Sequence, residues 1–181
     1  MFNREFVEED LKRHLNYQGT LKGLRFWSSL ITSLLRSPIF FRIFVLRHKQ
    51  WCKKKNLPSI PFLGFIATVR TFNGIQINTL DVGKGLKIQH GTSIVIGSGV
   101  KIGDYLTVLQ QVTIGNRDME GEGRFQYPVI GNNVHIGAGA NIIGDVRIGD
   151  GAKIGANALV VRDVPPKHVA VGIPARVVKS Q

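Results

Sequence analysis

Residues 96–115 (IGSGVKIGDYLTVLQQVTIG) and 130–160 (IGNNVHIGAGANIIGDVRIGDGAKIGANALV) share one pattern, in which an aliphatic residue returns at every sixth position. Glycine follows most of these residues, and another apolar residue lies four positions after each of them except Ile114. A period of six held over this many repeats indicates a solenoid of stacked β-coils. An amphipathic helix would repeat its apolar residues with a period near 3.6. The repeated aliphatic positions are Ile96, Ile102, Val108, Ile114, Ile130, Ile136, Ile142, Ile148, Ile154 and Val160.

The expected architecture is mainly β, a parallel β-helix shaped as a prism. Three short strands joined by tight turns close one coil of about eighteen residues. Such a prism has flat outer faces, so ligand sites are expected between neighbouring prisms or beneath a loop. The pattern breaks at residues 116–129, after which the six-residue spacing resumes at Ile130. It also breaks between Ile88 and Ile96, where two residues are inserted and His90 lies.

The basic charge of the chain is concentrated near its N-terminus. The 181 residues carry a formal net charge of +12, of which about +8 belongs to residues 1–60. A basic surface favours an anionic partner, but no nucleic-acid recognition motif is present, so we expect no binding of nucleic acid. The single Cys52 fits a reducing compartment and no signal peptide is visible, so we expect a cytoplasmic location.

The chain is expected to divide near residue 70. Residues 1–70 are predicted to form a basic, mainly helical segment, and residues 71–181 to form the β-helix. Within the β-helix we expect an extruded loop at 116–129 and a C-terminal cap at 163–181. A metal site on this prism would need about three imidazole ligands. Only two histidines lie within the repeats, so we expect no metal.

The N-terminal segment contains apolar residues at helical spacing, which predict a short helix over residues 1–22 and a pair of helices over residues 24–55. Arginines interrupt the pair too often for a transmembrane span. Two alternatives remain for it. The pair packs on the β-helix or on a partner subunit, or it lies as an amphipathic anchor at the inner face of an anionic cytoplasmic membrane.

Several short motifs between residues 74 and 178 resemble a known family, the hexapeptide-repeat acyltransferases, and within it the serine acetyltransferase branch. The resemblance implies a left-handed β-helix and a homotrimer with active sites between subunits. It also implies acetyl-CoA as co-substrate in the groove between adjacent prisms. The motifs are 88–92 (IQHGT), 108–115 (VLQQVTIG), 128–131 (PVIG), 136–140 (IGAGA), 163–166 (DVPP) and 172–176 (GIPAR).

The resemblance also implies roles for individual residues. His90 matches the catalytic general base, and an imidazole of near-neutral pKa is suited to take a proton from an attacking hydroxyl. Small residues in the late coils match the positions along which the pantetheine arm of CoA passes, and two lysines are candidates for its phosphates. These expected CoA-binding residues are Gly137, Ala138, Lys153, Gly155, Ala156 and Lys167.

The acceptor positions depart from the serine acetyltransferase pattern. The charged residues that hold an amino acid or orient the base in that branch are matched by Gln76, Gln89 and the pair Gln126-Tyr127. A zwitterion in a partly desolvated pocket would leave charges unpaired. These residues and Asn78 suit sugar hydroxyls instead.

The sequence is therefore similar in character to capsule and exopolysaccharide O-acetyltransferases of the colanic-acid type. Its predicted acceptor is a hydroxyl of a cell-surface polysaccharide or its precursor. Two alternatives remain: a serine O-acetyltransferase of cysteine biosynthesis, and a β-helix scaffold without catalysis.

Overall fold

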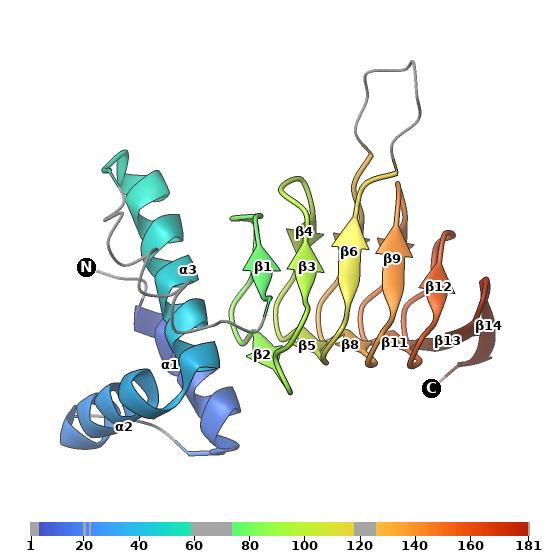
Figure 1. Ribbon diagram of the computed structural model, residues 1–181. Helices are drawn as coiled ribbons and strands as arrows, with labels where there is room; N and C mark the ends of the chain where they lie inside the picture. The colour runs from blue at the N-terminus through green and yellow to red at the C-terminus, as the bar shows by residue number, and fades with distance from the viewer. Residues whose placement is uncertain (1–3, 20, 22, 59–73, 118–125, 181) are drawn as a thin grey trace.

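The computed structural model describes residues 4–19, 21, 23–58, 74–117 and 126–180. Three helices gather at one end, and the β-coils stack in a row away from them (Figure 1). Most of the expected loop at 116–129 and all of residues 59–73 lie outside the described residues. The helices are α1 (Arg4–Leu15), α2 (Gly23–Arg36) and α3 (Pro38–Lys55). The strands are β1 (Gln76–Ile77), β2 (Lys87–Ile88), β3 (Val95–Ile96), β4 (Lys101–Ile102), β5 (Thr107–Val108), β6 (Thr113–Gly115), β7 (Val129–Ile130), β8 (His135–Ile136), β9 (Asn141–Ile143), β10 (Arg147–Ile148), β11 (Lys153–Ile154), β12 (Leu159–Val160), β13 (His168–Gly172) and β14 (Ala175–Ser180).

The strands form three sheets, which are the three faces of a prism. Sheet A has the order β1-β3-β6-β9-β12, sheet B has the order β10-β7-β4, and sheet C has the order β14-β13-β11-β8-β5-β2. Every described pairing between coils is parallel, and the antiparallel pairings among the described residues are the β13–β14 hairpin at the C-terminal end and an isolated bridge between Arg117 and Gln126. The predicted parallel β-helix is therefore confirmed.

The aliphatic residues of the six-residue pattern fill the inside of the prism. Ile96 pairs with Ile114 and Ile114 with Ile142 along sheet A, and each of these side chains is fully buried. Equivalent rows run along the other two sheets. Stacking identical apolar side chains from coil to coil gives one continuous core, which is why a two-residue strand suffices in each repeat.

Helix α3 closes the open end of the prism. Ser37 caps it by accepting a hydrogen bond from the backbone N–H of Phe40, and Pro38 occupies the first turn, where no N–H is needed. On its inner face, Ile43 and Leu46 join the core of the first coil. For α3, this packing corresponds to the alternative in which the helix pair packs on the β-helix.

No single described helix is long and apolar enough to span a membrane. By length and composition alone α2 and α3 would suffice together, but the chain bends by 113° between them.

Candidate functional site

His90 follows β2 at the corner where the chain turns from sheet C to sheet A. Its backbone φ is +51°, and its carbonyl accepts a hydrogen bond from the backbone N–H of Thr92 at 2.7 Å. The two-residue insertion found in the sequence therefore makes a tight turn whose left-handed backbone holds the imidazole outside the prism, where it is exposed. A solvent-accessible imidazole on a fixed turn is able to act as a base on a molecule lying against the corner.

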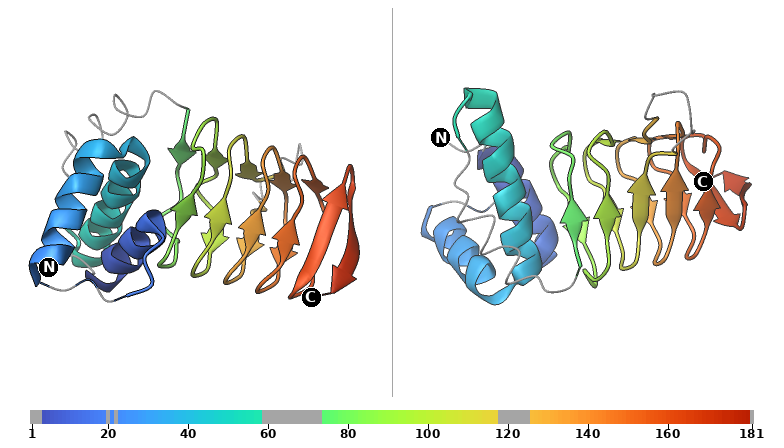
Figure 2. Two further views of the ribbon diagram at one scale, coloured as in Figure 1. Left: turned by 90° about the horizontal axis from the view of Figure 1, so that it is seen from below. Right: turned by 45° about the horizontal axis from the view of Figure 1, so that its top comes forward.

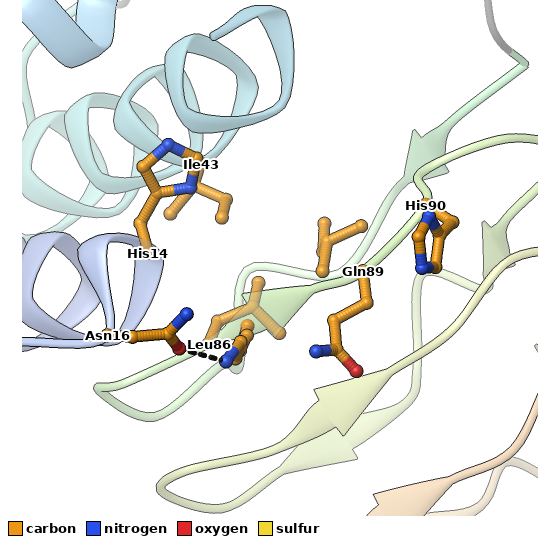
Figure 3. Close-up of a pocket in the computed structure, with 8 residues that line it drawn as sticks. His14, Asn16, Ile43, Leu86, Gln89 and His90 are labelled. Atoms are coloured by element: carbon orange, nitrogen blue, oxygen red, sulfur yellow. Dashed lines mark hydrogen bonds between the residues drawn. The ribbon is translucent and has the colours of Figure 1, made fainter.

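A cavity of about 240 Å³ lies beside His90 (Figure 3). Strand β2 forms one side of it, and helices α1 and α3 form the other. Within it Lys87 Nζ donates a hydrogen bond to Asn16 Oδ1 at 2.6 Å. Its lining residues are His14, Asn16, Ile43, Leu86, Lys87, Ile88, Gln89 and His90.

The wall formed by α1 was not predicted from the sequence. His14 and Asn16 lie more than seventy positions before His90, outside the repeats, and only the packing of α1 against β2 brings them there. Burial, and then the nearby ammonium of Lys87, lower the pKa of His14 below its ordinary value. His14 therefore presents a neutral imidazole to the cavity at neutral pH.

The proposed CoA-binding residues lie on the same face as His90. The backbone N–H groups of Gln89, Gly137 and Gly155 each donate to the next coil of sheet C, so these residues stand in one row along the edge of that sheet. Ala138 and Ala156 follow at the same corner, one residue beyond. The structure thus brings the predicted base and the predicted small-residue strip together within one chain.

The reason for a glycine at 137 differs from the one expected. A Cβ atom at Gly137 would lie 2.7 Å from the backbone nitrogen of Ala156 and 2.9 Å from the carbonyl carbon of Gly155. The stacking of neighbouring coils alone therefore requires this glycine. At Gly155 a Cβ would instead meet a side-chain atom of Val171 at 2.6 Å. Ala138 and Ala156, half-buried and exposed, are the positions that a ligand is able to approach.

The two lysines expected at the CoA phosphates are both exposed. Lys153 lies on β11, in register with His135 on β8, and burial followed by the charge of Lys153 lowers the pKa of that histidine. Lys167 lies just before β13, with a backbone φ of +58°. Both lysines belong to the late coils, as the predicted CoA path requires.

The acceptor residues are divided between two edges of sheet A. Gln76 is on β1, exposed, and pairs with Val95 of the neighbouring coil. Asn78 and Gln126 are exposed near the far edge, where sheet A turns toward sheet B, while His90 is at the near edge. The two edges are roughly 13 Å apart, about four residues of extended chain. One chain therefore does not bring Asn78 or Gln126 to His90.

Tyr127, the remaining predicted acceptor residue, lies at the same far edge. Its ring covers the turn Gly97–Gly99, because a Cβ atom at Gly99 would lie 2.2 Å from the ring. The hydroxyl of Tyr127 is 3.5 Å from that of Ser98. Within one chain the ring of Tyr127 thus packs against the turn of the neighbouring coil.

Among the residues that the structure describes, no group of three or more His, Cys, Asp or Glu side chains is arranged to hold a metal ion.

The fold and the comparisons define the class of this protein. The family model described as bacterial transferase hexapeptide (six repeats) matches residues 127–162. The apoenzyme structure of soybean serine acetyltransferase is 31% identical, with a TM-score of 0.74, and the match covers 97% of this chain and 68% of that chain. The chain therefore belongs to the hexapeptide-repeat transferases.

Within that class the chain is similar to serine acetyltransferases. The serine acetyltransferase of Synechococcus elongatus is 38% identical over 146 residues, which cover 80% of this chain and 59% of that protein. The soybean enzyme was also solved complexed with serine, with the same identity and TM-score. A serine acetyltransferase in complex with CoA is 28% identical, with a TM-score of 0.71 and coverage of 96% of this chain and 68% of that chain. This chain thus spans about three-fifths of the length of the curated cyanobacterial relative.

The prediction of a polysaccharide or sugar hydroxyl as acceptor is wrong, because the similar proteins are serine acetyltransferases. That prediction assumed that an amino acid would lose its hydration at neutral side chains. In the structure Gln76, His90 and Gln126 are exposed. Solvated amide groups bind an ammonium or a carboxylate through hydrogen bonds without the cost of burying an unpaired charge. Neutral residues at the acceptor positions therefore do not exclude serine. The similarity to capsule O-acetyltransferases was inferred from the same residues, so that inference is wrong as well.

Proposed function

We propose that this protein is an acetyl-CoA-dependent serine O-acetyltransferase in which His90 is the general base. The observation that carries the proposal is the position of His90: an exposed imidazole on a fixed turn, in line with the small residues Ala138 and Ala156 of the same face. The similarity to serine acetyltransferases solved with serine and with CoA supports the choice of both substrates.

The reaction follows from the chemistry of these groups. The imidazole of His90 takes the proton of the serine hydroxyl while the oxygen attacks the thioester carbonyl carbon of acetyl-CoA. A carbon–oxygen bond forms, the carbon–sulfur bond breaks, and the CoA sulfur leaves as a thiolate that accepts the proton from the imidazolium. A hydroxyl is a poor nucleophile at neutral pH, so removal of its proton during attack is the contribution of the base.

CoA lies along the late coils in this proposal. Its pantetheine arm passes Ala138 and Ala156, beside Gly137 and Gly155, toward His90. Lys153 and Lys167 are then the cations available for its phosphates.

Serine occupies the cavity beside His90 in this proposal, between β2 and α1. Gln89, His14 and Asn16 line that cavity and offer neutral hydrogen-bonding groups to the ammonium and carboxylate of serine.

Neighbouring copies complete the site in this proposal. Asn78, Gln126 and Tyr127 lie across sheet A from His90 within one chain, so they reach an acceptor only if a neighbouring subunit presents that edge. This division supports the homotrimer of left-handed β-helices that the family resemblance implies. A cytoplasmic location, where acetyl-CoA is made and cysteines stay reduced, fits the single buried Cys52.

The test is the release of CoA thiol from acetyl-CoA by the purified full-length protein. We expect L-serine to stimulate release with saturation, and glycine, which lacks the hydroxyl, to have no effect. Release that responds to no hydroxyl amino acid would overturn the serine proposal. If acetyl-CoA in addition gave no rise in the thermal unfolding midpoint, the alternative of a non-catalytic scaffold would be favoured, because a ligand that binds the folded state must stabilise it.

A further inference from the structure

Helix α2 buries only part of its apolar surface. Phe26 and Leu30 are 3% and 6% exposed and pack in the helical cluster at the N-terminal end. A second set of large apolar side chains on the same helix is exposed to solvent. These are Leu24 (88% exposed), Trp27 (56%), Ile31 (54%) and Leu35 (67%).

The exposed residues form one continuous stripe. They follow Leu24 at intervals of three, four and four positions, which places them on one side of an α-helix. The buried residues lie on the adjacent side. Arg25, Ser28, Thr32 and Arg36 occupy the remaining side, so an arginine stands near each end of the exposed stripe. In Figure 2, α2 is the helix farthest from the prism, and the other helices stand between it and the β-coils.

The stripe lies in a part of the chain with an extreme charge. Residues 11–80 contain twelve Lys and Arg and no Asp or Glu, a charge of +12 that equals the net charge of the whole protein. The acids of α1 offset part of this charge, but none of them pairs with an arginine of α2. Asp10 pairs with Arg47, Glu8 and Glu9 pair with Lys12, and Glu5 pairs with Lys84. In the described parts of the chain, no carboxylate is ion-paired with Arg25 or Arg36.

We propose that the exposed stripe of α2 binds the surface of an anionic lipid bilayer. An amphipathic helix with an aromatic residue in its apolar face and cations beside it lies in the plane of the membrane, with the apolar side chains among the lipid headgroups. Arg25 and Arg36 would then reach lipid phosphates while their aliphatic stems lie against the apolar surface.

The geometry of the helix pair favours this orientation. The chain bends by 113° between α2 and α3, so α2 packs against the helix that closes the prism without continuing along its axis. At about 1.5 Å per residue, α2 is about 21 Å long, which suits a helix lying on a bilayer better than one crossing it.

The same structure limits the membrane contact to α2. Among the aromatic residues of α3, Phe40 is 1% exposed and Trp51 is half-buried, so they are occupied by packing within the protein. A second copy of the chain is a poorer partner for the stripe than an anionic membrane, because two copies would bring the same uncompensated arginines together. The proposal concerns where the protein is held and does not depend on the identity of the acceptor.

The test is flotation of the full-length protein with lipid vesicles of two compositions, phosphatidylcholine alone and phosphatidylcholine with about a third phosphatidylglycerol. A Trp51→Phe background isolates the fluorescence of Trp27. We expect flotation with the anionic vesicles, a blue shift of the Trp27 emission, and loss of both signals at high salt. The variant Ile31→Gln/Leu35→Gln should reduce the bound fraction at least tenfold. Val178→Gln, which replaces an exposed valine at the opposite end of the prism, is the matched control and should bind as wild type does.

Three results would overturn the proposal. The protein fails to float with anionic vesicles at low salt, or the Ile31→Gln/Leu35→Gln variant floats as wild type does. In the third, sedimentation velocity without lipid shows that trimers of the wild-type protein associate further, and the same double substitution abolishes this association. That result would assign the stripe to a contact with a second copy of the chain. Circular dichroism and the unfolding midpoint establish that the variant is folded before any of these comparisons is made.

Discussion

The guanidinium of Arg47 on α3 donates two hydrogen bonds, of 2.7 and 3.0 Å, to the carboxylate of Asp10 on α1, and the two side chains form a buried ion pair. The pair also binds the first coil of the prism. Arg47 donates to the carbonyls of Val82 and Gly83, and Asp10 accepts from the backbone N–H of Leu86 at 2.9 Å. Burial raises the pKa of Asp10 above its ordinary value, and the hydrogen bonds from Arg47 and the backbone oppose this rise only in part. One ion pair thus fixes both helices to the strand that leads to His90.

The first prediction concerns this pair. Asp10→Ala should lower the free energy of unfolding by about 3–5 kcal/mol, because it leaves the Arg47 guanidinium buried without a counter-charge. Denaturant titration measures the change. Glu8→Ala is the matched control, because it removes an acid from an ion pair with Lys12 on the surface of the same helix. That change should cost no more than about 1 kcal/mol. Equal losses in the two variants would show that the buried pair does not join the helices to the prism.

The second prediction concerns the base. His90→Ala should lower kcat by about 10²–10⁴-fold, the usual contribution of a positioned general base, and leave CoA binding unchanged. Steady-state kinetics and calorimetric titration with CoA give the two numbers. His168→Gln changes an imidazole on the C-terminal hairpin, whose Nδ1 lies 2.7 Å from the carbonyl of Pro166, and should retain activity. A His90→Ala enzyme with full kcat would remove His90 from the mechanism.

The third prediction separates the two reasons for small residues in the late coils. Gly137→Ala should reduce the free energy of unfolding by about 1–3 kcal/mol, because its Cβ meets the backbone of the next coil. Ala156 is exposed, so Ala156→Tyr should leave the free energy of unfolding unchanged. The new ring would block the proposed path of the pantetheine arm and weaken CoA binding by about tenfold or more, about 1.4 kcal/mol. Lys101→Tyr on sheet B is the control for a new surface tyrosine. If CoA bound Ala156→Tyr normally, the proposed path of the pantetheine arm would be wrong.

The fourth prediction is a pH dependence of stability that arises from His14. Its pKa in the folded protein lies below the ordinary value of 6.5, so protons bind the unfolded chain more readily than the folded one. The stability that the neutral imidazole contributes is therefore present above pH 6.5 and is lost as the pH falls through the lowered pKa. Unfolding midpoints measured from pH 7.5 down to about pH 5 should fall, and they should fall less steeply in His14→Gln.

The pKa of His135 is also lowered, by burial and by the charge of Lys153, so part of the pH dependence should remain in the His14→Gln variant. An identical slope in wild type and His14→Gln would mean that His14 is not held neutral beside Lys87.

The sequence predicted the prism well because its signal is local and repeated. Each aliphatic residue from Ile96 to Val160 has the same environment in the next coil, so one rule determines strand position, register and core together. The insertion that carries His90 was visible for the same reason, as a departure from that rule. The capping of α3 at Ser37 and Pro38 is also local chemistry, and a pair of helices over residues 24–55 was predicted.

The site was predicted only in part because it depends on contacts between distant segments. His14 and Asn16 carry no motif, and only the docking of α1 beside β2 places them at the cavity. Gly137 was assigned to ligand access, whereas its neighbours in the next coil already exclude a side chain. The identity of the acceptor was predicted wrongly because residue type alone does not tell whether Gln76 or Gln126 is buried or solvated.

The most direct test of the account is to identify the product formed from acetyl-CoA and L-serine by mass spectrometry, with wild type and His90→Ala compared at equal protein concentration. The account predicts O-acetyl-L-serine in equal amount to the CoA released by wild type, and a trace at most from His90→Ala. Release of CoA without O-acetyl-L-serine, or equal product from both proteins, would contradict it.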